Sequence, residues 1–310
     1  MYHYIRDLVN SRYPGIKGLD INYFREQIDF LGSHFKIIGI EDLFNHTLPN
    51  YSGKDFVLLT FDDGYIDHYT SVFPILVEKG LPAFFSMPGK IIKENKVLDV
   101  NKIHFLLASV EIECLKSNIF DSLDNYRGKE FDIPDNGELY AELAVANRFD
   151  NKDVVFIKRL LQSKLDEHLR NLIVDSLFKE FITISEKAFS KELYMSMDQI
   201  KLMKKHGMYF GIHGYDHYWL GLLDKDKMQT DITNALDVFD EVVDKNDWIM
   251  CYPYGSYNND TLTFLKESGC SYAFTTKIAV AKLPIDKRLE LPRLDTNDFP
   301  PKSENYKIIV

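Results

Sequence analysis

Short apolar runs alternate with amphipathic stretches along most of the chain. Five runs rich in apolar, β-branched and aromatic residues are short enough for buried strands: 56–61, 82–87, 209–212, 248–251 and 272–275. Four stretches place apolar side chains at helical spacing: 65–79, 197–206, 226–244 and 261–267. This alternation predicts an α/β fold with a parallel sheet covered by helices.

A second region breaks this rhythm. Residues 101–191 predict several helices, with apolar positions at helical spacing from Val154 to Leu165 and from Leu169 to Phe178, and a turn-rich stretch at 126–137. We predict one domain over residues 1–310 that carries 101–191 as a helical insertion. Because the insertion follows a strand end, it is expected to serve either as a lid or as the contact of a homo-oligomer.

Two adjacent carboxylates follow the first long apolar run. Asp62 and Asp63 lie where that strand ends, and Gly64 follows as a breaker. Consecutive side chains there can point in different directions, so one carboxylate can bind a cation while the other acts as a base. The alternative is an Asp-Gly turn that closes a hairpin.

Two histidines follow the run at 209–212. His213 and His217 lie four positions apart, where one turn of chain brings their rings together, and Gly214 gives the loop conformational freedom. Alone, this spacing is also typical of a solvated helix face. Together with a carboxylate, two imidazoles occupy three positions on a divalent metal and leave room for water, which predicts a metal-dependent hydrolase.

A turn with two aromatic residues follows the run at 248–251. In Tyr252-Pro253-Tyr254-Gly255, the rings can wall a groove and a backbone N–H can face a developing oxyanion. A plain surface turn is the alternative.

Together these three segments resemble the polysaccharide deacetylase family, the carbohydrate esterases built on the NodB homology domain. Thr60 to Tyr65, the pair of histidines and Tyr252 to Gly255 match its first, second and third motifs, and Met1 to Tyr4 resembles the first strand of many members. The resemblance implies a distorted (β/α) barrel of about seven parallel strands. It also implies that Asp62 is the general base, that Asp63, His213 and His217 hold a divalent metal, usually zinc, and that the Tyr254 N–H helps to bind the oxyanion.

Three positions depart from the family pattern. Gly214 stands where a serine or threonine usually bonds across the loop, and Cys251 stands where an arginine usually orients the base. No histidine follows His217, so the usual late general acid has no counterpart. Arg293 and Asp295 are candidates for orienting the base. His3 is the best spare imidazole for the acid, although a core histidine is an equal alternative.

Composition and net charge restrict the kinds of partner that we expect. The chain has 310 residues, 45% of them hydrophobic, and a formal net charge of −10 without a Lys/Arg-rich run, which argues against nucleic acid or an anionic membrane as main partner. Three cysteines at irregular spacing argue against a disulfide framework. No signal-peptide pattern and no apolar stretch of bilayer length is present, so we expect a cytoplasmic protein without a transmembrane segment.

The predicted function is therefore removal of an N-acyl group, acetyl first, from an amino sugar. The expected location favours a nucleotide-linked or lipid-linked intermediate of surface glycan synthesis. Deformylation of a lipid-linked amino sugar and a carbohydrate-binding pseudoenzyme of the same fold remain as alternatives. A non-heme iron oxygenase also uses two histidines and a carboxylate, but its fold would not alternate strands with helices.

Overall fold

The computed structural model describes residues 1–44, 54–148, 150–183, 185–282 and 287–309. They form two compact units. The first unit combines Met1–Asp7, Gly18–Lys96 and Ser190–Val310, and the second combines Leu8–Lys17 and Val97–Phe189. The candidate chemistry predicted from the sequence lies in the first unit.

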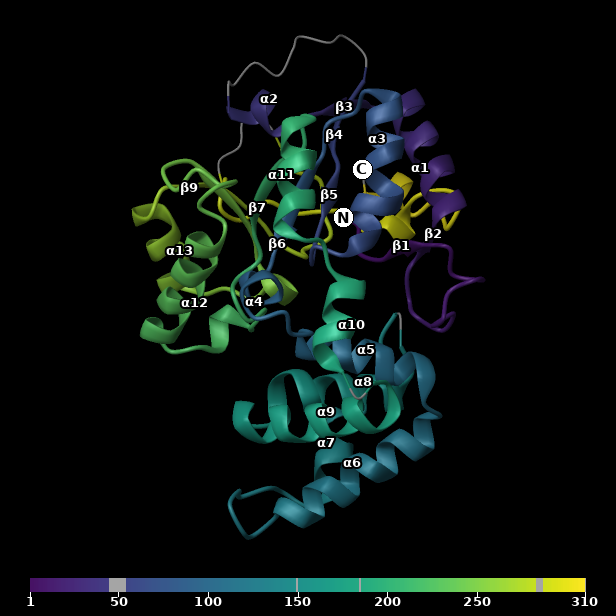
Figure 1. Cartoon of the computed structure of the whole chain (residues 1–310), viewed down its shortest axis with the longest axis vertical. Helices are drawn as coiled ribbons and strands as arrows, with labels where there is room; N and C mark the ends of the chain where they lie inside the picture. The colour runs from purple at the N-terminus through teal and green to yellow at the C-terminus, as the bar shows by residue number, and fades with distance from the viewer. Residues whose placement is uncertain (45–53, 149, 184, 283–286, 310) are drawn as a thin grey trace. The chain divides into compact units, whose positions relative to one another are not determined.

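Five parallel strands form the central sheet of the first unit, in the order β5-β6-β7-β8-β9 (Figure 1). They are β5 (Thr60–Phe61), β6 (Phe84–Met87), β7 (Tyr209–Ile212), β8 (Trp248–Cys251) and β9 (Cys270–Phe274). The predicted run 56–61 is divided at Leu59: β4 (Phe56–Leu58) pairs with β3 (Lys36–Ile38), and β5 pairs with β6. A small parallel pair, β1 (Ile5–Arg6) with β2 (Leu19–Asp20), completes the strands among the described residues.

Two further segments extend this sheet at its edges. Tyr2 bridges β5 in parallel, and Leu291 bridges β9 in parallel. The amino group of Met1 donates a hydrogen bond of 2.9 Å to the carbonyl of Leu294, so the two edge segments meet. The predicted distorted (β/α) barrel is confirmed, with five regular strands flanked by two single-bridge segments in place of about seven full strands.

Helices follow the strands as the sequence predicts (Figure 1). The main ones in this unit are α1 (Ile21–His34), α3 (Phe73–Lys79), α11 (Met197–Lys205), α12 (Lys225–Val238) and α13 (Asn259–Glu267). The stretch after β5 begins with a π-helical turn, η1 (His68–Val72). The predicted helix 226–244 ends early, because Phe239 leaves helical geometry and the chain turns there. Shorter elements are α2 (Ile40–Phe44), α4 (Gly89–Lys93), α10 (Glu186–Leu193), α14 (Tyr306–Ile309), η3 (Leu220–Leu222), η4 (Pro253–Gly255) and η5 (Thr296–Asp298).

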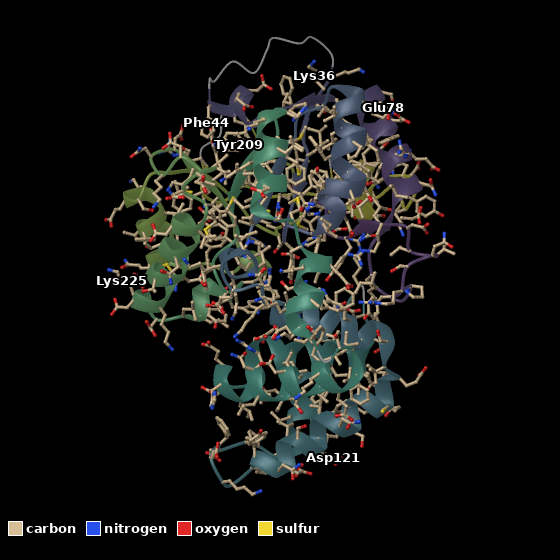
Figure 2. The ribbon with its side chains drawn as sticks, viewed as in Figure 1. Lys36, Phe44, Glu78, Asp121, Tyr209 and Lys225 are labelled. Atoms are coloured by element: carbon tan, nitrogen blue, oxygen red, sulfur yellow. The ribbon has the colours of Figure 1, made fainter. Side chains whose placement is uncertain are left out.

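The sheet is apolar on both faces, as expected for parallel strands covered by helices. On one face the ring of Phe85 stacks on Phe61, with ring centroids 4.8 Å apart, and on Phe210 at 5.5 Å. On the other face Phe84 belongs to a buried cluster with residues of β8 and β9. Phe44 packs at the edge of this cluster, and Figure 2 shows it beside Tyr209, with centroids 5.8 Å apart.

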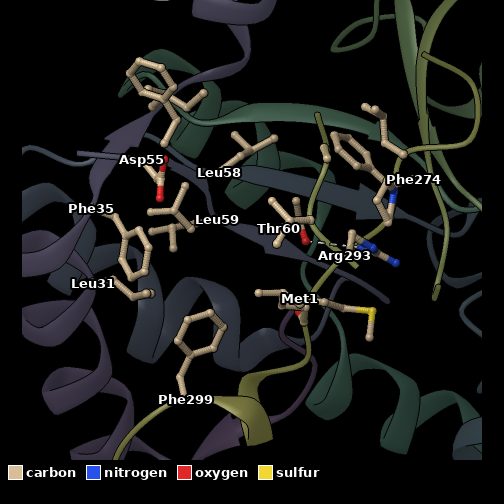
Figure 3. A pocket seen from close by; sticks show the side chains of 18 of the residues that line it. Met1, Leu31, Phe35, Asp55, Leu58, Leu59, Thr60, Phe274, Arg293 and Phe299 are labelled. Atoms are coloured by element: carbon tan, nitrogen blue, oxygen red, sulfur yellow. Dashed lines mark hydrogen bonds between the residues drawn. The ribbon is translucent and has the colours of Figure 1, made fainter. Parts of the chain in front are cut away.

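An apolar cavity of about 690 Å³ lies in the first unit. Its lining includes Leu31 of α1, Phe35 directly after α1, and Phe299 after η5. Thr60 and Arg293 lie together elsewhere on its wall, joined by a hydrogen bond (Figure 3). Arg293 thus has apolar surroundings on the cavity side. The polar contacts of this side chain lie within the predicted site.

The second unit is helical and has its own core. Its helices are α5 (Asp99–Ser109), α6 (Ile112–Tyr126), α7 (Asn136–Leu143), α8 (Lys152–Arg159), η2 (Leu160–Lys164) and α9 (Glu167–Phe181). The predicted turn-rich stretch separates α6 from α7, and side chains of Phe156, Leu160 and Ile173 form part of the core. The prediction of a lid or dimer contact stays a prediction. No described helix is long and apolar enough to cross a membrane.

Candidate functional site

The predicted site residues follow the carboxyl ends of parallel strands. Asp62 and Asp63 come after β5, His213 after β7, and Tyr254 lies in the turn after β8. In a parallel barrel these ends share one rim, where side chains from distant segments meet. Asp63, His213 and His217 are all buried, and one potential ligand atom from each lies within 4.8 Å of the others.

The Asp63 carboxylate faces both histidines. Its Oδ1 atom lies 3.3 Å from Nε2 of His213 and 3.3 Å from Nε2 of His217. This buried oxygen has no hydrogen-bond partner among the described residues, whereas Oδ2 accepts a hydrogen bond of 2.6 Å from the Tyr65 hydroxyl. A buried carboxylate oxygen that lacks a donor and faces two imidazole nitrogens matches the ligand set of a divalent cation such as zinc.

The ring of His213 is held in one orientation. Its Nδ1 atom lies 2.7 Å from the carbonyl oxygen of Cys251, which can only accept, so we assign the ring proton to Nδ1. The lone pair of Nε2 then points toward Asp63. Such a bond from the outer nitrogen is how metal-binding histidines are commonly oriented.

The backbone is strained where these ligands project. Asp63, His217 and Tyr254 have positive φ angles of 74°, 60° and 56°, and Asn95 is the only other non-glycine residue of this kind in the described parts of the chain. The left-handed region is unfavourable for residues with a Cβ and is concentrated at functional sites. Three of these four residues therefore mark the same site.

Arg293 donates a hydrogen bond to each oxygen of the Asp62 carboxylate. Nη1 donates to Oδ1 at 2.9 Å and Nη2 donates to Oδ2 at 2.8 Å, and Ser86 adds a third bond to Oδ1 at 2.7 Å. Burial acts to raise the pKa of Asp62, but the charge and hydrogen bonds of Arg293 outweigh it and hold that pKa well below its usual range. Asp62 is therefore an ionised, fixed carboxylate at neutral pH.

Arg293 makes further contacts around the site. Nε donates to the carbonyl of Thr275 at 2.9 Å, and Nη1 also contacts the Cys251 sulfur at 3.3 Å. Burial raises the pKa of the Cys251 thiol, which keeps it neutral beside the carboxylate. Cys251, which stands where the family pattern has an arginine, is thus in contact with the guanidinium that bonds Asp62.

Asp295 lies elsewhere. Its carboxylate accepts hydrogen bonds from the backbone N–H of Asn297 at 2.8 Å and from the side chain of Asn297 at 2.7 Å, which caps η5. Of the two candidates for orienting the base, the structure brings Arg293 to Asp62, whereas Asp295 caps its own turn.

His3 lies at the rim of the site. Its Nε2 atom is 3.9 Å from Oδ2 of Asp62, and its side chain is 43% exposed, which excludes a core histidine. Its carbonyl accepts a hydrogen bond of 2.9 Å from the buried His68, which fixes the backbone at this position. His3 therefore lies close to the Asp62 carboxylate and is open to solvent.

Tyr254 forms an aromatic wall with a residue that the sequence did not single out. Its ring stacks on Trp219 at 4.5 Å with an interplanar angle of 8°, and meets the His217 ring edge-on at 4.7 Å. The indole Nε1 of Trp219 is buried and has no hydrogen-bond partner among the described residues. The only signal in the sequence is an aromatic residue two positions after His217.

Two more residues at the site were missed. Ser86 is the single polar residue of β6, a position that could have signalled its role. Asp231 of α12 is 5% exposed and accepts the backbone N–H groups of Tyr215 and Asp216, between the two histidines. An acidic residue on the buried face of a helix was the available signal.

Sequence comparison identifies the family. The sequence model of the polysaccharide deacetylase family matches residues 50–111 and 165–273, more than half of the chain. The putative polysaccharide deacetylase YxkH of Bacillus subtilis (strain 168) is 27% identical over 103 residues. That match spans 33% of this chain and 37% of the length of YxkH.

Solved structures share the fold. The Streptococcus pyogenes deacetylase PplD in complex with acetate superposes with a TM-score of 0.57 at 18% identity. The match covers 100% of this chain and 95% of the PplD chain. IcaB from Ammonifex degensii gives 0.55 at 18% identity, with 96% and 92% covered. A de-N-acetylase from Aggregatibacter actinomycetemcomitans gives 0.53 at 16% identity, with 98% and 97% covered. The family match agrees with the motifs and the fold, and this chain belongs to the polysaccharide deacetylase family.

Proposed function

We propose that this chain is a metal-dependent hydrolase that removes an acyl group, acetyl first, from the nitrogen of an amino sugar. One observation carries the proposal: the buried, unpartnered Oδ1 of Asp63 lies 3.3 Å from Nε2 of both His213 and His217. Membership of a polysaccharide deacetylase family supports a carbohydrate amide as the substrate class.

Asp63, His213 and His217 would hold the cation, and two imidazoles with one carboxylate suit zinc. When bound, a cation of this kind acts as a Lewis acid and lowers the pKa of water. The acidity of the water matters here because Asp62, whose pKa is depressed, is always ionised but is a weak base.

Asp62 would accept the proton of the attacking water. A C–O bond then forms between that water and the acyl carbon, and the carbonyl π electrons move onto the oxygen. The backbone N–H of Tyr254 would donate a hydrogen bond to this oxyanion. Arg293 and Ser86 hold the Asp62 carboxylate during the transfer by the three hydrogen bonds described above.

Collapse of the intermediate breaks the C–N bond, and its electron pair goes to nitrogen. An amine leaves poorly unless it is protonated, so the proton that Asp62 took from the water must be transferred to that nitrogen. His3 would assist this transfer, since its Nε2 lies 3.9 Å from Asp62 Oδ2 and its ring reaches the rim. The products are a free amino sugar and acetate.

The stacked rings of Trp219 and Tyr254 would wall the groove beside the sugar. A flat apolar surface suits a sugar ring. The carrier of the sugar, a nucleotide or a lipid, and the cytoplasmic location stay predictions from the sequence.

Amine release tests this function. Metal-loaded protein is incubated with chitin oligomers, with a nucleotide-linked N-acetylglucosamine and with the N-formyl counterparts, and primary amine and free acid are measured. We expect equal amounts of amine and acetate, loss of both on chelation, and release slowed roughly 10²–10⁴-fold in Asp62→Asn. Absence of amine from every substrate, with protein that holds one equivalent of zinc, would refute the proposal. Release from formyl substrates alone would identify a deformylase.

A further inference from the structure

The two histidines lie on a loop that has no regular secondary structure of its own. His213 follows β7 directly, His217 adopts a positive φ, and residues 213–219 contain no helix or strand. A loop of this kind places ligands accurately only if its backbone groups are bonded from outside.

Partners from two helices bond this loop. The carboxylate of Asp231 accepts the N–H of Tyr215 at 2.9 Å through Oδ1 and the N–H of Asp216 at 2.9 Å through Oδ2. From α4, the N–H groups of Gly89 and Lys90 donate to the carbonyls of Gly214 and Tyr215, both at 3.0 Å. Asp231 is 5% exposed, so both of its bonds are sheltered from water.

Gly214 packs closely against the carboxylate of Asp231. Gly214 has a φ of 68°, and a Cβ added to it would lie 2.7 Å from Oδ1 of Asp231, closer than real side chains come. A side chain at position 214 and the carboxylate of Asp231 therefore exclude each other in this geometry. In the family pattern a serine or threonine at position 214 bonds across the loop.

We propose that Asp231 is a positioning residue that sets the metal affinity of His213 and His217, in place of a hydroxyl at position 214. The carboxylate of Asp231 bonds the loop from α12, whereas a serine at position 214 would bond it from within the loop. This inference rests on the proposed function, because the metal is what the loop would hold.

Zinc affinity tests it, measured on the full chain by competition with a chromophoric chelator. Asp231→Ala should weaken zinc binding roughly 10–100-fold, the usual effect of losing an outer partner of a metal ligand. Asp231→Asn should regain part of this, since the amide oxygen can still accept from the loop. Asp237→Ala, an exposed aspartate on the same helix that pairs with Lys245, is the matched control and should leave affinity unchanged.

A second pair of variants tests the fit between the two positions. Gly214→Ser alone should weaken zinc binding, because its Cβ meets Asp231. In the double variant, Gly214→Ser with Asp231→Ala, the hydroxyl has room to bond the loop. Its loss of zinc affinity should therefore be smaller than the product of the two single-variant losses. If Asp231→Ala proves unstable, the zinc affinity of Asp231→Asn decides the question, because its amide oxygen can replace only one of the two carboxylate acceptors.

The outcomes separate the two proposals. Wild-type affinity in Asp231→Ala, or independent losses in the double variant, would overturn the role of Asp231 while leaving the metal site intact. Zinc binding that Asp63→Ala does not weaken would instead refute the proposed function.

Discussion

Replacing Arg293 by methionine should destabilise the first unit strongly. The change removes both hydrogen bonds to Asp62 and leaves a carboxylate that is 1% exposed without its counter-ion. Losing one partner of a buried ion pair costs about 3–5 kcal/mol. Adding Asp62→Asn to Arg293→Met should restore roughly 1–3 kcal/mol, because the uncompensated charge is then gone.

The effect should depend on pH. In the wild-type protein the depressed pKa of Asp62 contributes stability above its ordinary pKa, and this contribution is lost only as the pH falls into the acid range. In Arg293→Met, burial acts without the guanidinium and raises that pKa above its ordinary value. A raised pKa costs stability as the pH rises through it, so the deficit relative to wild type should be larger at pH 8 than at pH 5.

Tryptophan fluorescence during urea unfolding provides the assay. The chain has two tryptophans, Trp219 and Trp248, and both lie in the first unit, so the signal reports on that unit alone. A chelator in every sample removes the contribution of bound metal. Arg25→Met is the control, because its pairing with Glu78 at 3.9 Å is exposed and should be worth no more than about 1 kcal/mol. A double variant as unstable as the sum of its single changes would refute the reasoning.

Three further predictions concern catalysis. Asp63→Ala or His217→Ala should weaken zinc binding roughly 100-fold or more while the fold persists, since each removes one of three protein ligands. Full zinc occupancy by elemental analysis would contradict this. Asp62→Asn should keep the metal but lose turnover roughly 10²–10⁴-fold, and near-normal kcat would place the base elsewhere. His3→Ala should slow an acetamide more than an activated ester, whose leaving group needs little protonation, with metal content unchanged. Equal loss on both substrates would indicate a structural role for His3.

The strands could be predicted where burial on both faces left a continuous apolar run. The observed β7 and β8 have the predicted boundaries for that reason. The run 56–61 also looked continuous, but its first half pairs with β3 and its second half with β6, and strand pairing of this kind is a long-range property. Likewise, nothing local indicated that α12 would end at Val238.

The cluster of Asp63, His213 and His217 could be predicted from the spacing of the motifs, but the residues that support it could not. The bond from Arg293 to Asp62 spans 231 positions, and that from Asp231 to Tyr215 joins a loop to a later helix. Arg293 and Asp295 were indistinguishable in the sequence because both are charged residues of one short segment. The structure separates them, since the chain turns into η5 directly after Asp295. The positive φ angles of Asp63 and His217 have no local sequence signal either.

Diffraction from crystals grown with zinc, recorded at the zinc absorption edge, tests the central claim most directly. The account predicts one strong anomalous peak in contact with Oδ1 of Asp63 and with Nε2 of His213 and His217, the three atoms that already converge in the structure. A peak bound elsewhere, with none between these three side chains, would contradict it.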